Sequence, residues 1–370
     1  MRIAQIAPLQ VSVPPLNYGG TERVIANMTE GLVRLGHDVT LFATGDSTTS
    51  ARLVPLVESA FNFDPAINPL PFHLAALAEV YRHAGEFDII HSHLDYLTLP
   101  FAAQCATPTV ITLHGPITIP REQRSLRAAD PAVHFVSISD SQRAPLPDLN
   151  WAATIHHGVD VASFRYYSEP GSYLAFVGRI SPEKDPVSAI EIAKMAGIPL
   201  KIAAKVDPVD RRYFTECVEP LLDHPLIEFL GPLDERHKRA LMGHALALLA
   251  PIAWPEPFGM VFIEALASGT PVLARPRGAA REVLLDGVTG FVRESNEALA
   301  AAVGELRGLS RARCRRYCEQ HFDAMRMARD YARVYHQITA GARERGELAG
   351  LRLGRAGRSE EHSVLNLTGV

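Results

Sequence analysis

Short apolar runs alternate with helical patterns along most of this chain, and this alternation limits its fold more than any other feature. A short apolar strand followed by a helix is the pattern of βαβ units, which build parallel sheets. The first series of expected strands is Arg2–Ala7, Asp38–Ala43, Asp88–His91, Thr109–Leu113, His134–Ser137 and Thr154–His156. The second series is Tyr173–Val177, Leu200–Ala204, Ile227–Leu230, Ala247–Ala250, Pro271–Ala274 and Gly290–Val292. The sequence therefore predicts two doubly wound α/β domains.

A segment without apolar periodicity separates the two series. This segment, "DVASFRYYSEPGSY" (Asp160–Tyr173), contains a Pro-Gly pair, and we interpret it as the interdomain linker. With 370 residues, 47% of them hydrophobic, the chain is long enough for two cores. Helices are expected over Thr21–Leu35, Asp185–Ala196, Asp234–Met242 and Ala324–Thr339. The Gly- and Arg-rich tail that follows lacks aromatic residues, and we expect it to be disordered or loosely attached.

Charge and composition exclude several classes of function. The net charge of -4 gives no strongly basic surface, so nucleic acid is not an expected partner. The start, "MRIAQIAPL", lacks the apolar core of a signal peptide, and the apolar stretches are too short to span a bilayer. Four scattered cysteines fit reduced thiols, so we expect a soluble, cytoplasmic protein. Arg121, Arg124 and Arg127 recur every third residue and could make a weak contact with a membrane surface.

Polar residues that follow the expected strands are the candidates for a ligand site, because open α/β sheets bind ligands at the carboxyl ends of their strands. Arg179 and Lys184, in "FVGRISPEKDP", fall in a strand-to-helix loop, where two cations suit a diphosphate. The loop is not a Walker A motif. Gly19 and Gly20 precede Thr21, the expected N-cap of a helix, and offer backbone N–H groups to an anion.

The stretch "WPEPFGMVFIEALASGTPVLA" contains a carboxylate that needs an explanation. Glu264 falls in the middle of an otherwise apolar helical pattern. Burial of an unpaired carboxylate costs several kcal/mol, roughly, so Glu264 must find donors or stay out of the core.

The combination of "NYGGTERVIANMTEGLVRLGHDVTLFA", "DIIHSH", "TLHGP", "FVGRISPEKD" and "EPFGMVFIEALASGTPVLA" resembles the retaining, nucleotide-sugar-dependent glycosyltransferases of the group 1 family. The resemblance covers about residues 1–340. It implies the GT-B architecture, in which two Rossmann-like α/β domains face each other across a cleft. The implied parts are an N-terminal acceptor-side domain (1–162), a C-terminal donor domain (163–322), a helix that crosses back to the N-terminal domain (323–342) and a polar tail (343–370).

The resemblance also implies roles for single residues. Glu264, the second glutamate of the E-x7-E element, would accept hydrogen bonds from the ribose hydroxyls, which are vicinal donors. Glu256, the first glutamate, would lie beside the donor sugar. The implied catalytic residues are His114, Arg179, Lys184 and Glu256. The implied donor-binding residues are Gly19, Gly20, Arg179, Lys184, Glu256, Phe258, Gly259, Met260 and Glu264, and those on the acceptor side are His93, Ser139 and Arg143.

The family's reaction breaks the anomeric C–O bond, and the cations and amides would stabilise the departing diphosphate. The sequence shows no separate nucleophile, which is compatible with the front-face retaining route usually proposed for this family. Metal-dependent glycosyltransferases typically carry an Asp-x-Asp triplet, and the nearest approach here is Asp207-Pro-Val-Asp210. We therefore expect no metal and no cofactor beyond the nucleotide sugar. One loop departs from the family pattern, with Arg277, a single Gly278 and Arg281.

The partners implied are a nucleotide-sugar donor, with a UDP-sugar favoured over a GDP-sugar, and a small-molecule, glycan or lipid acceptor. The nucleotide base, the sugar, the acceptor and the oligomeric state cannot be read from the sequence. Two alternatives stay open. His91, His93 and Asp95 have the H-x-H-x-D spacing of a dinuclear metallohydrolase, although Tyr96 stands where that motif normally has another histidine. The other alternative is a GT-B-shaped epimerase, hydrolase or non-catalytic binder of sugar nucleotides.

Overall fold

Two parallel sheets form the frame of the molecule. The computed structural model describes residues 1–16 and 18–359. The first sheet has the strand order β3-β2-β1-β4-β5-β6-β7 and the second β10-β9-β8-β11-β12-β13. The first-sheet strands are β1 (Arg2–Ile6), β2 (Asp38–Thr44), β3 (Arg52–Val57), β4 (Ile89–Ser92), β5 (Thr109–Thr112), β6 (His134–Ser137) and β7 (Trp151–Thr154). Those of the second are β8 (Leu174–Arg179), β9 (Leu200–Lys205), β10 (Ile227–Gly231), β11 (Ala247–Ala250), β12 (Val272–Ala274) and β13 (Gly290–Val292). The prediction of two α/β domains is confirmed.

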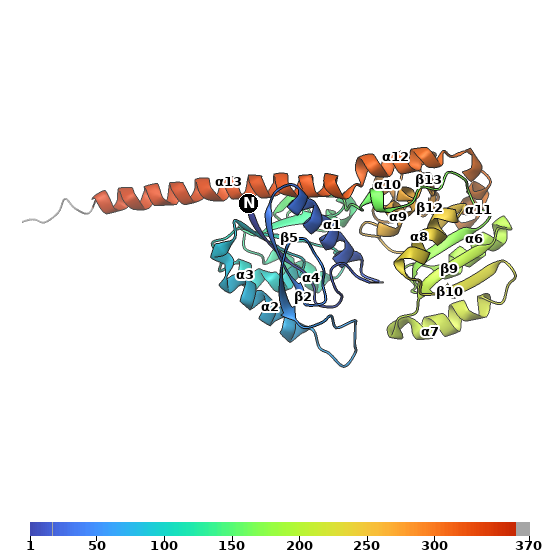
Figure 1. Cartoon of the computed structure of the whole chain (residues 1–370), viewed down its shortest axis with the longest axis horizontal. Helices are drawn as coiled ribbons and strands as arrows, with labels where there is room; N and C mark the ends of the chain where they lie inside the picture. The colour runs from blue at the N-terminus through green and yellow to red at the C-terminus, as the bar shows by residue number, and fades with distance from the viewer. Residues whose placement is uncertain (17, 360–370) are drawn as a thin grey trace, which may run out of the picture.

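Helices cover both sheets and give the molecule two lobes (Figure 1). The first domain contains α1 (Gly20–Arg34), α2 (Leu70–Arg82), α3 (Leu99–Ala102), α4 (Pro120–Arg127) and α5 (Asp140–Arg143). The second contains α6 (Pro186–Ala196), α7 (Arg211–Tyr213), α8 (Glu235–His244), α9 (Met260–Ala267), α10 (Ala280–Val283), α11 (Asn296–Val303) and α12 (Arg311–His321). The last helix is α13 (Ala324–Ser359). None of the helices among the described residues is long and apolar enough to cross a membrane.

The strands in the middle of each sheet are buried on both faces, which explains why most of their residues are apolar. Every residue of β4 and β11 is buried. The edge strands differ, and two of them depart from the predicted positions. Strand β3 was not expected, because its sequence "RLVPLV" contains a proline, which an edge strand with a single partner tolerates. Strand β7 covers Trp151–Thr154, whereas the prediction placed the strand at Thr154–His156. The strand begins earlier because its pairing with β6 starts at Trp151, opposite Phe135.

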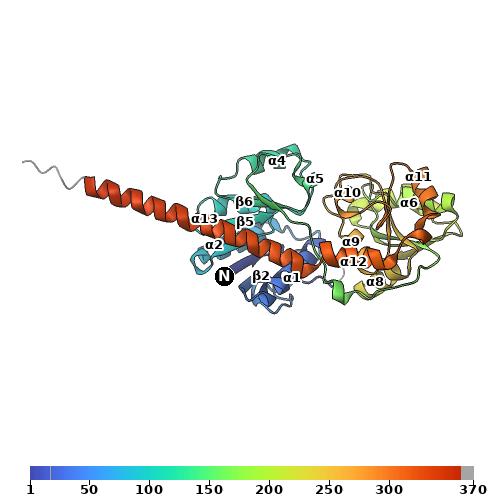
Figure 2. The same cartoon turned by 90° about the horizontal axis from the view of Figure 1, so that it is seen from above.

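The C-terminal helix α13 leaves the second domain and lies along the first, beside α1 (Figures 1 and 2). Its residues Tyr331 and Tyr335 are fully buried and belong to the same core cluster as Ile3 and Met28. The helix continues to Ser359, whereas the prediction ended it near residue 342 and expected a tail without regular structure. The sequence "ARERGELAGLRLGRAGRS" is rich in Ala, Arg, Glu and Leu, which favour helix. The rest of that predicted tail, 360–370, lies outside the described residues.

The chain crosses between the domains at two points that lie side by side. Val159, in the first crossing, forms a β-bridge with Asp323, in the second. The segment expected as a linker contains only one short 3-10 turn, Val161–Ser163, yet it is not loose. Phe164 is buried in a core cluster that also holds Phe262 of α9. Both crossings are therefore anchored by packing.

The contact between α1 and α13 yields a prediction about stability. A Cβ atom at Gly31 of α1 would lie 2.5 Å from the Cβ of Ala328 in α13. Gly31→Ala should lower stability by about 1–2 kcal/mol, because overpacking outweighs the gain of about 1 kcal/mol in helix propensity. Melting temperatures measured by circular dichroism test this. Gly85→Ala is the matched control, since nothing lies within 4 Å of a Cβ there. A Gly31→Ala protein as stable as the wild type would contradict this packing.

Candidate active site

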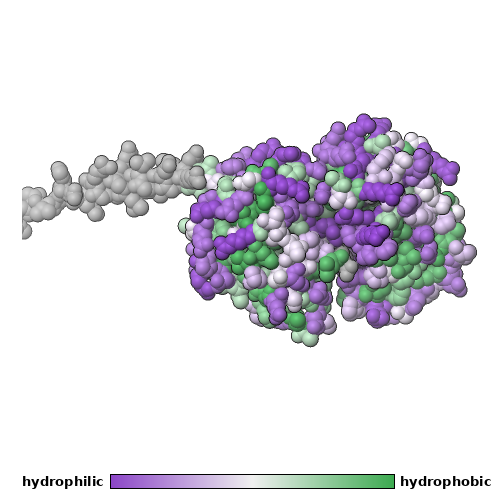
Figure 3. Space-filling model, in the orientation of Figure 1, coloured by the Kyte–Doolittle hydropathy of each residue, from purple (hydrophilic) through white to green (hydrophobic). Residues whose placement is uncertain are grey.

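Each sheet has one point where the strand order reverses, and the candidate site residues follow the strands at these two points. In the first sheet the reversal lies between β1 and β4, and in the second between β8 and β11. Ligands bind beyond the carboxyl ends of strands at such switch points. Gly19 and His93 come from the loops after β1 and β4, while Lys184 and Glu256 come from those after β8 and β11. Figure 3 shows the hollow between the two lobes.

The loops after β8 and β11 hold the predicted cations and the first glutamate of E-x7-E. Lys184 Nζ lies 2.5 Å from a carboxylate oxygen of Glu256, and the indole N–H of Trp254 donates to the same oxygen over 2.8 Å. The N–H of Ala253 donates to the carbonyl of Glu183 over 2.9 Å, which ties the two loops together. Lys184 and Glu256 therefore form a prearranged, partly buried ion pair.

Arg179 ends β8 on the same side of the second sheet. Its guanidinium lies 3.6 Å from the carboxylate of Asp207, which also pairs with Lys205 at 2.7 Å. The Nε atom of Arg179 is buried and has no hydrogen-bond partner among the described residues. Arg179 therefore keeps one N–H group available for a further acceptor.

Glu264 of α9 is only 5% exposed, and basic residues from both domains pair with it. Lys238 of α8 lies 3.1 Å from one carboxylate oxygen, and Arg23 of α1 lies 3.9 Å from the other. Arg23 and Lys238 also pair with Glu235, at 2.9 and 3.0 Å. This cluster spans the cleft, because α1 belongs to the first domain and α8 and α9 to the second. Glu264 thus receives one hydrogen bond, from Lys238, and one longer ion pair, from Arg23, and sequence analysis singled out neither side chain.

The N-terminus of α1 faces this group. The helix begins at Gly20, and Gly19 is its N-cap, whereas the sequence predicted Thr21 in that role. Gly19 has a φ of 154°, and a Cβ there would lie 2.8 Å from the Cβ of Pro15, so the close turn requires glycine. Glu22 is buried in the first turn, and burial raises its pKa to about 7. An acidic side chain therefore shares this turn with the N–H groups expected to bind an anion.

Aromatic residues join the two sides of the cleft. Lys205 Nζ of the second domain lies 4.6 Å from the ring centre of Tyr18, just before α1. Burial raises the pKa of the Tyr18 hydroxyl, and Arg179 opposes that shift. Phe258 packs edge-on against His157 of the first domain, with the ring centres 5.0 Å apart. Gly259 follows as the N-cap of α9, with a φ of 87°, and Met260 is the first helical residue.

His114 follows β5 and lies among other buried histidines. Its Nε2 atom is 2.8 Å from Nδ1 of His93, and its ring stacks on His157 with centres 5.3 Å apart. Burial lowers the pKa of His114 to about 3, so its ring is neutral at pH 7. Asp95, two residues beyond His93, has a left-handed φ of 45°. Burial raises the pKa of Asp95 to about 7, although the main-chain N–H of His114 donates to its carboxylate.

The two histidines of H-x-H-x-D lie close together, with ring centres 4.2 Å apart, but their ring nitrogens contact other protein groups. His91 contacts Gln5, Thr112 and Tyr335, and His93 contacts Gln5 and His114. Within residues 1–16 and 18–342, whose side chains the structure describes, no group of three or more His, Cys, Asp or Glu residues is arranged to hold a metal ion. The metallohydrolase alternative therefore has no site in the described part of the chain.

The other expected residues lie at the domain interface or away from the cations. Ser139 caps α5, and its hydroxyl donates to the carbonyl of Pro257 over 2.7 Å. Arg143 lies over the ring of Trp151 at the edge of the first sheet, without a contact to His93 or His114. Arg277 pairs with Glu294 at the surface. Gly278 packs closely against the main chain of Glu256, because a Cβ atom at this position would lie 2.1 Å from the carbonyl oxygen of Glu256.

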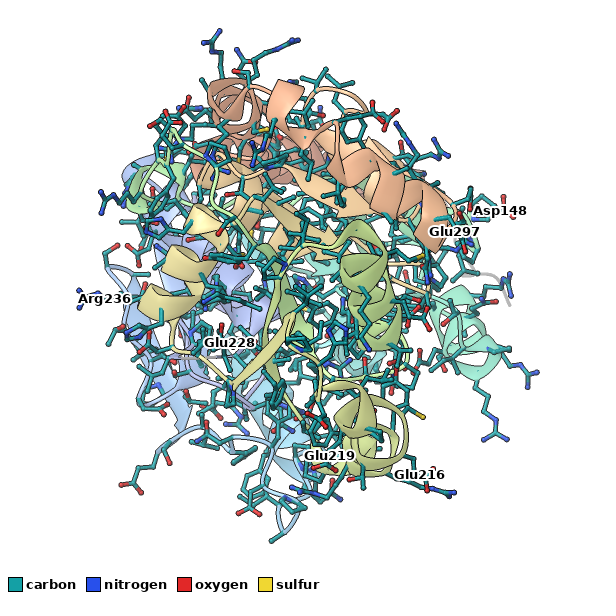
Figure 4. All side chains as sticks on the ribbon, turned by 90° about the vertical axis from the view of Figure 1, so that its right-hand side faces the viewer. Asp148, Glu216, Glu219, Glu228, Arg236 and Glu297 are labelled. Carbon is teal, nitrogen blue, oxygen red and sulfur yellow. The ribbon has the colours of Figure 1, made fainter. Side chains whose placement is uncertain are left out.

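Arg23, Lys238, Trp254, Tyr18 and Lys205 are the cleft residues that sequence reasoning missed. Three of them lie within the quoted motifs: Tyr18 and Arg23 in "NYGGTER", and Trp254 two residues before Glu256. Lys238 and Lys205 had no such signal, because their positions depend on how helices and strands distant in sequence pack together. The exposed charges on the outer end of the second domain, such as Glu216 and Arg236, point into solvent (Figure 4).

Comparison with known proteins matches both domains to glycosyltransferase families. Residues 18–163 match the model described as Glycosyltransferase Family 4, and residues 167–320 match the one described as Glycosyl transferases group 1. A phosphatidyl-myo-inositol mannosyltransferase of Mycolicibacterium smegmatis is 27% identical over 83% of this chain and 85% of that protein. A D-inositol 3-phosphate glycosyltransferase of the same species is 25% identical, over 79% of this chain and 80% of that protein.

Solved structures agree with the two-domain arrangement. AviGT4, a glycosyltransferase involved in avilamycin A biosynthesis, superposes with a TM-score of 0.68 at 25% identity, over 92% of this chain and 98% of that one. Anabaena HepE in complex with UDP and glucose has the same fold, with a TM-score of 0.68 at 19% identity over 90% and 98% of the two chains.

Glu22 yields a prediction about pH. Its ordinary pKa of 4.5 rises to about 7 in the folded protein, so the folded state binds this proton more tightly than the unfolded chain. The wild type should therefore lose stability between pH 4.5 and pH 7, with the full loss present above pH 7. Glu22→Gln should melt several degrees higher than the wild type at pH 8, and this difference should shrink towards zero as the pH approaches 4.5.

The control for this pH series is Glu219→Gln, because Glu219 is exposed on the outer end of the second domain (Figure 4). Its melting temperature, measured at each pH, gives the baseline for replacing a carboxylate by an amide. A Glu22→Gln difference from the wild type that stays constant with pH would contradict the raised pKa of Glu22.

Proposed function

The chain belongs to the group 1 glycosyltransferase family and has the GT-B fold, and from this premise we propose that it transfers a sugar from a nucleotide-sugar donor to a hydroxyl acceptor with retention of anomeric configuration. The observation that carries the proposal is the meeting of Arg23 with Glu264 across the cleft, 3.9 Å apart. It brings the N-terminus of α1 to the helix that holds the second E-x7-E glutamate. A nucleoside diphosphate bound between α1 and α9 would contact both domains.

In the proposed complex, the diphosphate lies between the N-terminus of α1 and the loop after β8. The spare Nε–H of Arg179 and the backbone N–H groups at Gly19 and Gly20 would donate to phosphate oxygens. Lys184 would turn from Glu256 to the phosphate. The Glu256 carboxylate could then accept hydrogen bonds from hydroxyls of the donor sugar. Lys184 and Glu256, which pair with each other in the structure, would thus bind neighbouring parts of one ligand.

Glu264 would accept hydrogen bonds from the two ribose hydroxyls. A carboxylate has about four lone-pair positions, and the hydrogen bond from Lys238 occupies only part of that capacity. The two basic residues would hold the Glu264 side chain in one direction while the ribose binds. The backbone N–H groups at Phe258, Gly259 and Met260, where α9 begins, would lie near the sugar and the phosphate.

The reaction we propose is a front-face displacement. The bond between the anomeric carbon and the leaving phosphate oxygen breaks, and the acceptor oxygen forms its bond to the same face of that carbon. The proton of the acceptor hydroxyl passes to the departing phosphate oxygen, so the products are the glycoside and the nucleoside diphosphate. Arg179 and Lys184 would stabilise the charge that develops on the leaving group. His114, neutral at the end of β5, would contact the transferring sugar.

The donor we favour is a UDP-sugar, with a GDP-sugar second, and no metal or cofactor takes part in this scheme. The inositol-based names of two relatives make inositol phosphates and phosphoinositides the first acceptors to test. If the acceptor is a lipid, α4 is the candidate surface for contact with its membrane, because Arg121, Arg124 and Arg127 are exposed there. Weak contact with an anionic membrane surface stays a prediction, as does the cytoplasmic location.

The first test removes the cations proposed to hold the diphosphate. Arg179→Ala combined with Lys184→Ala should lower the initial rate of sugar transfer at least about 100-fold, because each such contact contributes roughly 2–4 kcal/mol to transition-state stabilisation. Lys194→Ala is the matched control, since Lys194 lies in the last turn of α6, the helix that Lys184 precedes. The rate should be followed as release of nucleoside diphosphate, with and without acceptor. A folded double variant with near-normal turnover would show that the donor site lies elsewhere.

The second test concerns metal. Arg179, Lys184 and helix N-termini supply positive potential without a dissociable ion, so transfer should proceed at an unchanged initial rate in excess EDTA. Purified protein should be assayed after chelation and again after addition of Mn²⁺ or Zn²⁺. A rate that disappears with EDTA and returns with either ion would overturn this account of leaving-group stabilisation.

A further inference from the structure

A line of hydrogen bonds runs from His114 through the core of the first domain to Tyr335 of the C-terminal helix. His114 Nε2 lies 2.8 Å from His93 Nδ1, and His93 Nε2 lies 2.9 Å from the side-chain oxygen of Gln5. The Gln5 amide nitrogen donates to the hydroxyl of Tyr335 over 3.1 Å. Gln5 is fully buried, and His93 is 3% exposed. Each ring nitrogen of His93 thus has one protein partner.

Hydrogen bonds along such a line must all run in the same direction, because a neutral imidazole has one donor and one acceptor nitrogen. In one direction, Gln5 accepts from His93 Nε2–H, and His93 Nδ1 accepts from His114 Nε2–H. His114 Nδ1 then carries no proton. In the opposite direction, every bond reverses and His114 Nδ1 carries an N–H group.

The free end of the line decides between the two directions. His114 Nδ1 is buried and has no hydrogen-bond partner among the described residues. A buried N–H group without an acceptor is rarer than an acceptor with unused capacity. The arrangement of Gln5 agrees, since its nitrogen faces Tyr335 and its oxygen faces His93. The Tyr335 hydroxyl can then donate to His91 Nδ1, which lies 2.5 Å away.

We infer that Gln5, acting through His93, fixes His114 in the tautomer with the proton on Nε2, so that Nδ1 is a bare acceptor for a hydroxyl group of the substrate. This inference rests on the proposed function, in which His114 contacts the transferring sugar. Gln5 and His93 are positioning residues, because they reach the substrate only through His114. The burial that lowers the pKa of both histidines keeps the line neutral, and a neutral ring leaves the lone pair of Nδ1 available.

A bare Nδ1 atom distinguishes hydrogen-bond donors of the ligand from acceptors. A hydroxyl can donate to a bare nitrogen, whereas an ether oxygen or a fluorine at the same position of the sugar cannot. A site that accepts a hydrogen bond discriminates strongly against ligands without the donor, because its own polar group stays unpaired. The imposed tautomer would therefore make His114 a reader of one hydroxyl group.

The direct test is the tautomer of His114 in the full-length protein without substrate. Protein labelled with ¹⁵N in histidine should give a long-range ¹H–¹⁵N spectrum at pH 7.5 in which the His114 signals show a proton on Nε2 and none on Nδ1. His114→Asn identifies these signals by their loss. A proton on Nδ1 of the wild-type ring would overturn the inference, whatever the protein's activity.

The second test changes Gln5 and reads both the tautomer and the kinetics. Gln5→Met keeps the length of the side chain and removes the acceptor, so His114 should become a mixture of tautomers. In the scheme proposed, kcat should fall about 10-fold, the effect of losing one neutral hydrogen bond in the transition state, while the KM for donor changes less than about twofold. A lower kcat with an unchanged tautomer would show a merely structural effect and overturn the inference. So would a mixed tautomer with an unchanged kcat.

The matched control is Tyr81→Phe. Tyr81 is a half-buried tyrosine of α2 in the same domain, and its hydroxyl contacts Thr109, outside the hydrogen bonds that link Gln5 to Tyr335 and His91. The His114 tautomer should stay the same in this variant, and a change would contradict the route through Gln5. Loss of transfer in the Arg179 and Lys184 variants tests the proposed function separately, because the tautomer is measured without donor, acceptor or turnover.

Discussion

The first domain cannot complete its core without the helix that ends the described chain. Tyr331 and Tyr335 of α13 are fully buried against β1 and α1, in a cluster with Ile3 and Met28. Full burial of two large aromatic side chains is worth several kcal/mol, roughly, so α13 is a structural part of the domain that it crosses to. The second domain is consequently an insertion, with both of its connections at the bridge between Val159 and Asp323. This arrangement keeps the two sheets facing each other and allows residues from both to form one site.

The cleft between the sheets is lined by charges that already have partners. Lys184 pairs with Glu256, Arg179 with Asp207, and Glu264 with Lys238. Partly buried charges require such partners, since an unpaired ion in a low-dielectric setting is costly. A ligand that carries both phosphates and hydroxyls can take the places of these partners. Its phosphates accept hydrogen bonds from the cations, and its hydroxyls donate to the carboxylates. Binding in this site would thus be an exchange of partners more than the filling of empty positions, and that exchange favours ligands with both kinds of group.

Much of the frame could be predicted from the sequence, because most residues of the buried parallel strands are apolar and the strands are separated by helices of recognisable period. Strand β6 has the predicted bounds, and α6 begins one residue after the predicted start. The edge strands β3 and β7 were missed or shifted, since a strand with one neighbour needs fewer apolar residues. Glu264 could be recognised as a buried carboxylate, but its partners Arg23 and Lys238 could not. The link between His93 and Gln5 was equally invisible, because it depends on the register of β1 against β4.

The inserted arrangement also has a consequence for biosynthesis. A ribosome delivers the second domain before the α13 residues that complete the core of the first. The second domain is continuous from β8 to α12 and can bury its own two sheet faces as soon as it emerges. The first domain is translated earlier, but its apolar surface around Ile3 and Met28 stays exposed until Tyr331 and Tyr335 have been synthesised and can pack against it. We therefore expect nascent chains to mature in the reverse of their order of synthesis, with a chaperone-accessible apolar surface on the older half.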